Sequence, residues 1–208
     1  MKLLIPSLIV SLAATAQPAV QLILGNASVM EGTAGTTTLA LTATTGNSPA
    51  ALEFSVTYSA DVTGVTVAAG TADTTANKTL ACGTATPTSI TCIVYGINQT
   101  LIANGPVATV AFTTVKTPAS RSESLGIGNT TASSATGTVI TSGGTGGTLT
   151  ILSIYDLNKD GAVNSADVLL MLNEALGITS CTDKIGDGLC NVGDVMLEVL
   201  AVLGVIPT

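Results

Sequence analysis

One short segment gathers oxygen-bearing side chains at regular intervals. Residues 156–167 read DLNKDGAVNSAD, and a calcium loop places oxygen ligands at its positions 1, 3, 5, 7, 9 and 12, with glycine at position 6. The residues at these positions are Asp156, Asn158, Asp160, Ala162 (through its carbonyl), Asn164 and Asp167, with Gly161 at the turn. Because three carboxylates in one loop repel each other without a cation, the spacing predicts a calcium site. The alternative is an Asp- and Asn-rich turn that caps a helix.

The same pattern returns 183 − 156 = 27 residues later in the chain. The second copy offers Asp183, Asp187, Leu189 (through its carbonyl), Asn191 and Asp194, again with glycine, Gly188, at position 6. Position 3 is Ile185, which has no side-chain oxygen, so a water would have to replace that ligand. The copy therefore predicts a second, weaker calcium site. The alternative is a loop held closed by a disulfide that binds calcium poorly.

Each loop runs into an apolar segment of helix-forming residues, 167–176 and 194–203, and each segment ends at a glycine, as helices often do. Residues 151–155 read as extended, so no helix precedes the first loop. The residues expected to pack one helix on the other are Val168, Leu169, Leu172, Ala175, Leu176, Val195, Val199, Val202 and Leu203. Leu170, Met171, Met196, Leu197 and Leu200 remain as an apolar surplus. We expect this surplus to cover either another protein or the chain's own β-structure.

The first two thirds of the chain alternate apolar and polar residues in short runs, as in 39–43, 52–58 and 107–112. Period-two alternation predicts strands with one buried face, and turn signals lie at 46–49, 83–87 and 104–106. Residues 141–147 are either a flexible linker or, as we favour, a turn before a last strand at 148–152. The fold class predicted is mostly β, a β-sandwich or jelly roll followed by a small α module of two calcium loop–helix repeats.

Composition limits the function. The 208-residue chain has a net charge of −7 and no His. Residues 20–152 carry five acidic and three basic side chains, and residues 153–208 carry eight and two. An acidic chain without a basic cluster is a poor nucleic-acid binder. The few carboxylates outside the loops and the absence of His argue against a glycosidase or a Ser-His-Asp enzyme, so no catalytic residue is expected.

The N-terminus reads as an export signal. A positive start, an apolar run too short to span a bilayer and a small–any–small site predict a signal peptide over 1–16; the alternative is a buried N-terminal strand. No later segment could span a membrane.

In an oxidising compartment the four cysteines are expected to pair locally, Cys82 with Cys92 and Cys181 with Cys190. Four free buried thiols are the alternative, and the spacing argues against zinc.

The paired loops, each ending in Asp and leading into one helix, resemble the dockerin type I module over residues 153–206. The resemblance implies calcium binding and docking to a cohesin domain on a partner protein. In that family a Ser/Thr pair at loop positions 10 and 11 contributes to docking. The corresponding residues here are Ser165 and Ala166 in the first repeat and Val192 and Gly193 in the second, which departs from the standard pair.

Residues 20–152 resemble a cohesin-type domain through segments 52–61, 107–112 and 147–151 taken in order. Together the two resemblances imply a secreted bacterial docking protein, without catalytic activity, connected with polysaccharide degradation or surface assembly. Its partners would be cohesin- or dockerin-bearing secreted proteins, or further copies of itself joined head to tail. The alternative function is carbohydrate binding, although the chain has no Trp and only five aromatic residues, Phe54 and Tyr58 among them.

Overall fold

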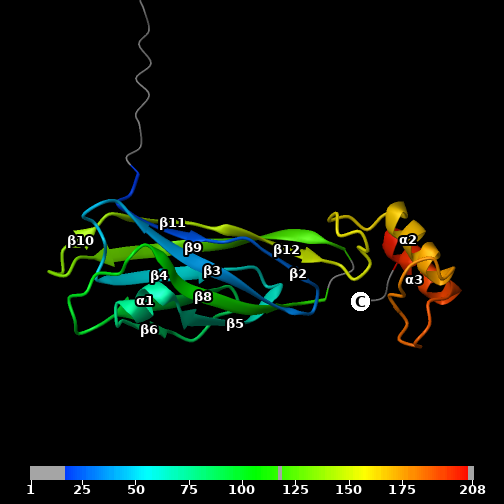
Figure 1. The fold of residues 1–208 in the computed structure, drawn as a ribbon, viewed down its shortest axis with the longest axis horizontal. Helices are drawn as coiled ribbons and strands as arrows, with labels where there is room; N and C mark the ends of the chain where they lie inside the picture. The colour runs from blue at the N-terminus through cyan, green and yellow to red at the C-terminus, as the bar shows by residue number, and fades with distance from the viewer. Residues whose placement is uncertain (1–16, 117–118, 206–208) are drawn as a thin grey trace, which may run out of the picture.

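The computed structural model describes residues 17–116 and 119–205, so the predicted export signal lies outside the described residues. Figure 1 shows an elongated β-sandwich with two helices, α2 and α3, at one end. Among the described residues, no helix is long and apolar enough to cross a membrane.

The sandwich is built from two sheets. The first sheet has the strand order β11-β1-β3-β8-β5, and its strands are β1 (Val20–Leu24), β3 (Ala34–Ala43), β5 (Val62–Ala69), β8 (Gly105–Thr114) and β11 (Ser142–Thr145). The second has the order β2-β12-β9-β4-β7-β6, with β10 paired to β9. Its strands are β2 (Ala27–Met30), β4 (Ala51–Thr57), β6 (Thr79–Cys82), β7 (Ser89–Tyr95), β9 (Arg121–Ser133), β10 (Val139–Ile140) and β12 (Gly147–Leu152). Most pairs are antiparallel, but β1–β11 and β2–β12 are parallel.

The core lies between the sheets and is made of the inward residues of the alternating strands. Phe54 and Val56 of β4 are fully buried, as are Val107 of β8 and Leu149 of β12. Of the three segments named for their alternation, 39–43 lies within β3 and 107–112 within β8, and 52–58 extends one residue past the end of β4. The prediction of a mostly β sandwich is therefore confirmed.

Two local expectations were wrong, and one short helix was not anticipated. Residues 142–145 form strand β11 and are neither a linker nor a turn, because the glycines there let the backbone approach its neighbours closely. A Cβ at Gly143 would come within 2.9 Å of Pro18 Cγ, and one at Gly144 would collide with Ile127. Gly105 and Pro106, expected in a turn, begin β8. The short helix α1 (Thr71–Thr75) was not expected, since five residues are too few to show a helical period.

After β12 the chain forms two loops and two helices, α2 (Ser165–Ala175) and α3 (Val192–Val202), which pack mainly against each other. Each helix is followed by a glycine with positive φ, Gly177 at 72° and Gly204 at 69°, as expected of helix ends. The predicted local disulfides are confirmed: Cys82 joins Cys92 between β6 and β7, and Cys181 joins Cys190 across the second loop. Such bonds persist in an oxidising compartment.

Candidate functional site

The first loop is folded around Asp156, whose side chain is 1% exposed. Its Oδ1 accepts the backbone N–H of Asp160 at 3.1 Å, and its Oδ2 accepts the N–H of Gly161 at 3.0 Å. These bonds bend the chain back on itself and hold the backbone of positions 5 and 6 against the carboxylate of position 1.

Asp167, at position 12, closes the same loop from the helix side. Its Oδ1 accepts the N–H groups of Leu157 at 2.9 Å and Asn158 at 3.2 Å, and its Oδ2 accepts that of Asn164 at 2.9 Å. Asn164 caps α2 by accepting the N–H of Ala166 at 2.8 Å. Asp167 and Asn164 thus form a capping box that joins the loop to the helix.

The second loop repeats most of this hydrogen-bond pattern, but the donor to Oδ1 of its leading aspartate is Gly186 at position 4, where the first loop uses Asp160 at position 5. Asp194 accepts the N–H groups of Lys184 at 2.8 Å, Ile185 at 3.2 Å and Asn191 at 2.9 Å. Burial alone would raise the pKa of Asp194, but these backbone donors lower it overall. Asp183 accepts the N–H of Gly188 at 2.7 Å, as Asp156 accepts that of Gly161.

The backbone confirms that one conformation is used twice. Positions 4 and 6 have positive φ in both loops: Lys159 at 60° and Gly161 at 94° in the first, and Gly186 at 81° and Gly188 at 84° in the second. Glycine adopts this conformation without steric cost, whereas Lys159 adopts it at a steric cost. The internal repeat seen in the sequence is therefore a repeat of structure.

The residues of the first loop offer oxygen atoms alone, which suits a hard cation. In the structure the side-chain amide of Asn158 donates to Asp160 Oδ2 at 2.8 Å, and that of Asn164 donates to the carbonyl of Ala162 at 3.3 Å. Turning either amide would present its oxygen in place of its N–H. Within residues 17–116 and 119–205 no three acidic or cysteine side chains converge as a metal centre. A cation would therefore need the amide and carbonyl oxygens as well as the carboxylates.

The second loop differs at position 3. Ile185 points toward the start of α3, where a Cβ at Gly193 would lie 2.5 Å from Ile185 Cδ1. Asp187 accepts the side-chain amide of Asn191 at 3.1 Å and the N–H of Leu189 at 2.9 Å. The disulfide adjoins this loop, because Cys181 and Cys190 stand just before and inside it. Five of the six ligand positions of the second loop therefore carry an oxygen ligand, and position 3 is apolar.

The helices carry matching rows of exposed apolar side chains, which we call the helix stripes. The stripe of α2 comprises Leu169, Leu172 and the C-cap residue Leu176. The stripe of α3 comprises Val192, Met196, Val199 and the C-cap residue Leu203. Leu169, Leu172 and Leu176 correspond to Met196, Val199 and Leu203 at the 27-residue offset. The expectation that Leu169, Leu172, Leu176, Val199 and Leu203 pack between the helices was wrong, and Met171, expected as surplus, is fully buried.

The predicted partner-binding residues lie at the helix starts. Ser165, Ala166 and Val192 are exposed, and Gly193 is half-buried. Ser165 and Val192 are repeat equivalents, and Val192 begins the stripe of α3, whereas the stripe of α2 begins one turn after Ser165, at Leu169. Gly193 has a structural explanation of its own, since it leaves room for Ile185.

A buried carboxylate lies in the interior of the helix pair. Glu198 of α3 is fully buried at the repeat equivalent of Met171, and within the described structure neither of its oxygens has a hydrogen-bond partner. Burial raises the pKa of Glu198 to about 7, and the ammonium of Lys184 opposes this rise. Lys184 itself donates to the carbonyl of Ile154 and lies 5.6 Å from the ring centroid of Tyr155. The positively charged side chain of Lys184 thus faces the interior of the module.

A second exposed apolar surface, which the sequence analysis missed, lies on the outer face of strands β9, β4 and β7. Ile93 and Tyr95 of β7 are 43% and 46% exposed, and Ile93 stands beside Glu53 of β4, which in turn stands beside Thr131 of β9. These residues border a hollow of about 260 Å³. The sequence did not indicate this face, because the outward Ile93 and Tyr95 alternate with inward residues of β7 that are apolar too.

The aromatic side chains offer little to a sugar. Phe54, Tyr58 and Phe112 are buried and Tyr155 is half-buried, so Tyr95 is the one exposed ring among the described residues. Sugar-binding faces need stacking rings. The carbohydrate alternative therefore rests on a single side chain.

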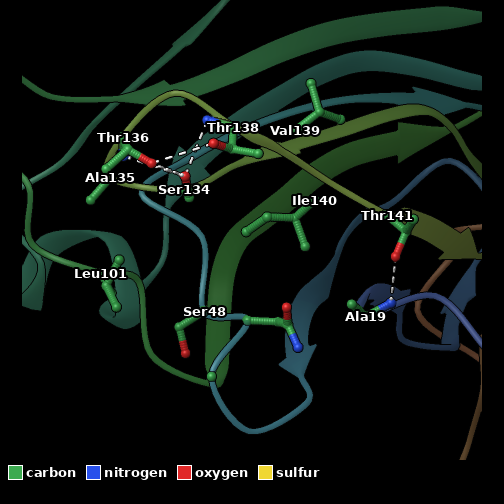
Figure 2. A pocket seen from close by; sticks show the side chains of 12 residues that line it. Ala19, Ser48, Leu101, Ser134, Ala135, Thr136, Thr138, Val139, Ile140 and Thr141 are labelled. Atoms are coloured by element: carbon green, nitrogen blue, oxygen red, sulfur yellow. Dashed lines mark hydrogen bonds between the residues drawn. The ribbon is translucent and has the colours of Figure 1, made fainter.

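A further hollow, of about 480 Å³, has the lining shown in Figure 2. It lies beside β10, at the end of the sandwich opposite the helices (Figure 1). It is bordered by β10 and by the loops before β4 and β10. Ser134 Oγ there accepts the N–H of Thr138 at 3.1 Å, and Thr141 Oγ1 accepts the N–H of Ala19 at 3.1 Å. Its lining has hydroxyl, amide and aliphatic groups but no ionisable side chain. The hollow itself therefore supplies no acid or base.

The carboxylates of the sandwich have separate structural roles. Asp61 pairs with Arg121 at 2.7 Å, and Glu123 lies 3.5 Å from the same guanidinium. Asp73 is fully buried on α1, where burial raises its pKa to about 7. Glu31 accepts the N–H of Ile154 at 2.9 Å.

No protein-family model and no curated protein sequence matches the chain, but solved structures do. The cohesin of a type I cohesin–dockerin complex from Clostridium thermocellum is 14% identical, with a TM-score of 0.59 over 68% of this chain and 98% of that one. The sixth scaffoldin B cohesin of Acetivibrio cellulolyticus, solved with a dockerin, is 16% identical, with a TM-score of 0.57 over 64% and 99%. A non-cellulosomal cohesin from the archaeon Archaeoglobus fulgidus is 17% identical, with a TM-score of 0.54 over 64% and 91%.

The share of this chain that matches, about two thirds, is also the share taken up by the sandwich at residues 17–152. At these identities the likeness concerns architecture and not function. The sandwich of this chain has the cohesin fold.

Proposed function

We propose that this chain is a secreted, non-catalytic docking protein with two binding surfaces, a cohesin-type face on the sandwich and a calcium-dependent dockerin-type module at the C-terminal end. The observation that carries the proposal is the pair of exposed helix stripes, related by the same 27-residue repeat as the loops. Small exported domains do not usually leave such apolar surface in water. α2 and α3 pack mainly on each other, so the sandwich leaves the stripes uncovered.

Calcium is the cation that this module would hold. Asp156, Asn158, Asp160, the Ala162 carbonyl, Asn164 and Asp167 would supply the first set of oxygens. Asp183, Asp187, the Leu189 carbonyl, Asn191 and Asp194 would supply a weaker second set, completed by water in place of Ile185. The cation would neutralise the carboxylates and hold each loop against the start of its helix.

Two observations support the sandwich as the second binding surface. Its fold is that of cohesins, and cohesins of this fold have been solved in complexes with dockerins. Ile93 and Tyr95 expose apolar surface on one sheet face, beside the single carboxylate of Glu53. The partners would be dockerin- and cohesin-bearing secreted proteins, including further copies of this chain. A role in extracellular polysaccharide degradation or surface assembly would follow from such partners.

A binding experiment with surface variants tests the proposal. The full chain is immobilised and exposed, in calcium, to purified cohesin domains, purified dockerin modules and a second copy of itself. L169D with M196D should abolish binding to cohesin domains, and I93D should abolish binding to dockerin modules. V139D is the matched control, because Val139 is 74% exposed but belongs to neither surface. If every variant binds as the unmodified chain does, or if nothing binds, the proposal is wrong.

A further inference from the structure

A short joint, buried at its first residue, Ser153, connects the sandwich to the first loop. β12 ends at Leu152, and Ser153, Ile154 and Tyr155 alone separate it from Asp156. Ser153 is fully buried and Asp156 nearly so. Because buried polar groups need hydrogen-bond partners, this joint must draw on the neighbouring strands.

The turn between β2 and β3 supplies the first set of partners. Glu31 Oε1 accepts the N–H of Ile154 at 2.9 Å and the hydroxyl of Ser153 at 3.4 Å. The backbone N–H of Glu31 donates to the carbonyl of Leu152 at 2.8 Å. The joint is therefore held to the sandwich on both sides of Ser153.

Ser120, in the connection from β8 to β9, supplies the second set. Its hydroxyl accepts the N–H of Ser153 at 2.9 Å and donates to Asp156 Oδ2 at 2.8 Å. Asp156 is the leading residue of the first loop, and the same Oδ2 accepts the N–H of Gly161. One hydroxyl from the sandwich thus orients the leading carboxylate of the loop.

The second loop has a different arrangement. The recorded hydrogen bonds to the Asp183 carboxylate come from Gly186 and Gly188, both within its own loop. Within the described part of the chain, the sandwich hydroxyl therefore acts on one loop of the two.

We propose that Ser120 is a positioning residue for the cation of the first loop, and that through it the sandwich sets the calcium affinity of that loop. This inference rests on the proposed calcium binding. A donor that fixes the orientation of a ligating carboxylate typically contributes 10–100-fold to metal affinity. By linkage, calcium in the first loop also stabilises the joint at residues 153–155.

The test uses the full chain carrying Asp187→Ala, which removes a ligand of the second loop, after calcium has been stripped with chelator. This Asp187→Ala chain is the parent of the other variants. In calorimetric titration, adding Ser120→Ala should weaken calcium binding about tenfold relative to this parent. Ser120→Thr, which keeps a hydroxyl, should stay closer to the parent affinity. The matched control is Ser124→Ala, an exposed serine of β9, which should leave the affinity unchanged.

Hydrogen exchange gives a second readout that a merely structural serine would not move. Calcium should slow amide exchange at Ser153 and Tyr155 in the parent and in Ser124→Ala but not in Ser120→Ala. If Ser120→Ala binds calcium as tightly as the parent and shows the same calcium-dependent protection, the positioning role is wrong while calcium binding stands. If the parent itself binds no calcium, both the inference and the proposed calcium site are wrong.

Discussion

At the scale of single residues, the loop carboxylates are placed by backbone N–H groups. Asp156 and Asp167 of the first loop, and Asp183 and Asp194 of the second, each accept at least two such donors. The spacing of the aspartates predicted which residues share a loop. It could not predict Ser120, because that residue lies 36 positions before Asp156 and meets it through the fold.

The two loops should respond unequally to loss of their central carboxylate. Asp160→Ala should lower total calcium binding more than Asp187→Ala, since the first loop has a full set of oxygen ligands and the second already lacks one at Ile185. Calorimetric titration of the stripped full chain measures both variants, with Glu53→Gln as a remote control. Equal losses would show that Ile185 does not weaken the second loop.

Asp73 predicts how the stability of the sandwich depends on pH. Burial raises its pKa from 3.8 to about 7, and within the described residues both carboxylate oxygens are buried without a hydrogen-bond partner. The folded state therefore holds a proton that the unfolded state releases. The contribution of this group to stability is full below about pH 4, falls between about pH 4 and 7, and stays lost above.

Asp73→Asn removes this ionisation at nearly constant size. The variant should be more stable than the unmodified chain at pH 8, by at least about 1 kcal/mol, and the gain should shrink toward pH 4. Urea unfolding of the full chain at both pH values measures it, with the exposed Glu53→Gln as control. An equal effect at pH 4 and pH 8 would contradict the raised pKa.

At the scale of elements, the ends of both helices could be predicted from the glycines that follow them, but the helices begin at Ser165 and Val192, two residues before the predicted 167 and 194. The capping boxes place these starts, because Asp167 and Asp194 bond back to the N-cap from inside the first turn. The sequence could not predict which face of each helix is buried, because both helices are apolar on more than one side. The structure shows what decides it. Asp167 and Asp194 must turn inward to close their loops, and the residues one turn later, Met171 and Glu198, follow them into the interior.

In the sandwich, strands with period-two alternation could be predicted, but β11 and the outer face of β7 could not. β11 reads Ser-Gly-Gly-Thr, so it has no alternation to detect, and its glycines serve the close approach to β1 and β9. The exposed Ile93 and Tyr95 lie in a strand whose inward residues are apolar too. An apolar residue on an outer face is identified only when the sheet is known.

The disulfide of the second loop should limit the loop's freedom without calcium. Replacing Cys181 and Cys190 by serine should weaken calcium binding at that loop by about tenfold, within the roughly 3 kcal/mol that a loop of this size can contribute. The measurement is a calcium titration of the full chain carrying Asp160→Ala, so that the second loop dominates. Unchanged affinity would mean that the backbone donors to Asp194 suffice to organise the loop.

At the scale of the whole molecule, the loop–helix pair lies at one end of a cohesin-fold sandwich (Figure 1). Hydrogen bonds among Ser153, Glu31 and Ser120 join the two. The joint gives the helix stripes a defined position at one end of the sandwich. The outer face of β9, β4 and β7 belongs to the side of the sandwich and not to that end. A chain with two such surfaces can bind two partners at once, or link copies of itself head to tail.

Calcium-dependent docking is tested most directly by sedimentation velocity of the full chain mixed with purified cohesin domains, first in calcium and then after addition of chelator. We expect a complex in calcium that dissociates in chelator, and a complex weakened by Asp160→Ala even in calcium. If a complex survives both chelator and Asp160→Ala, or if no complex forms in calcium, the chain is not a calcium-dependent docking protein.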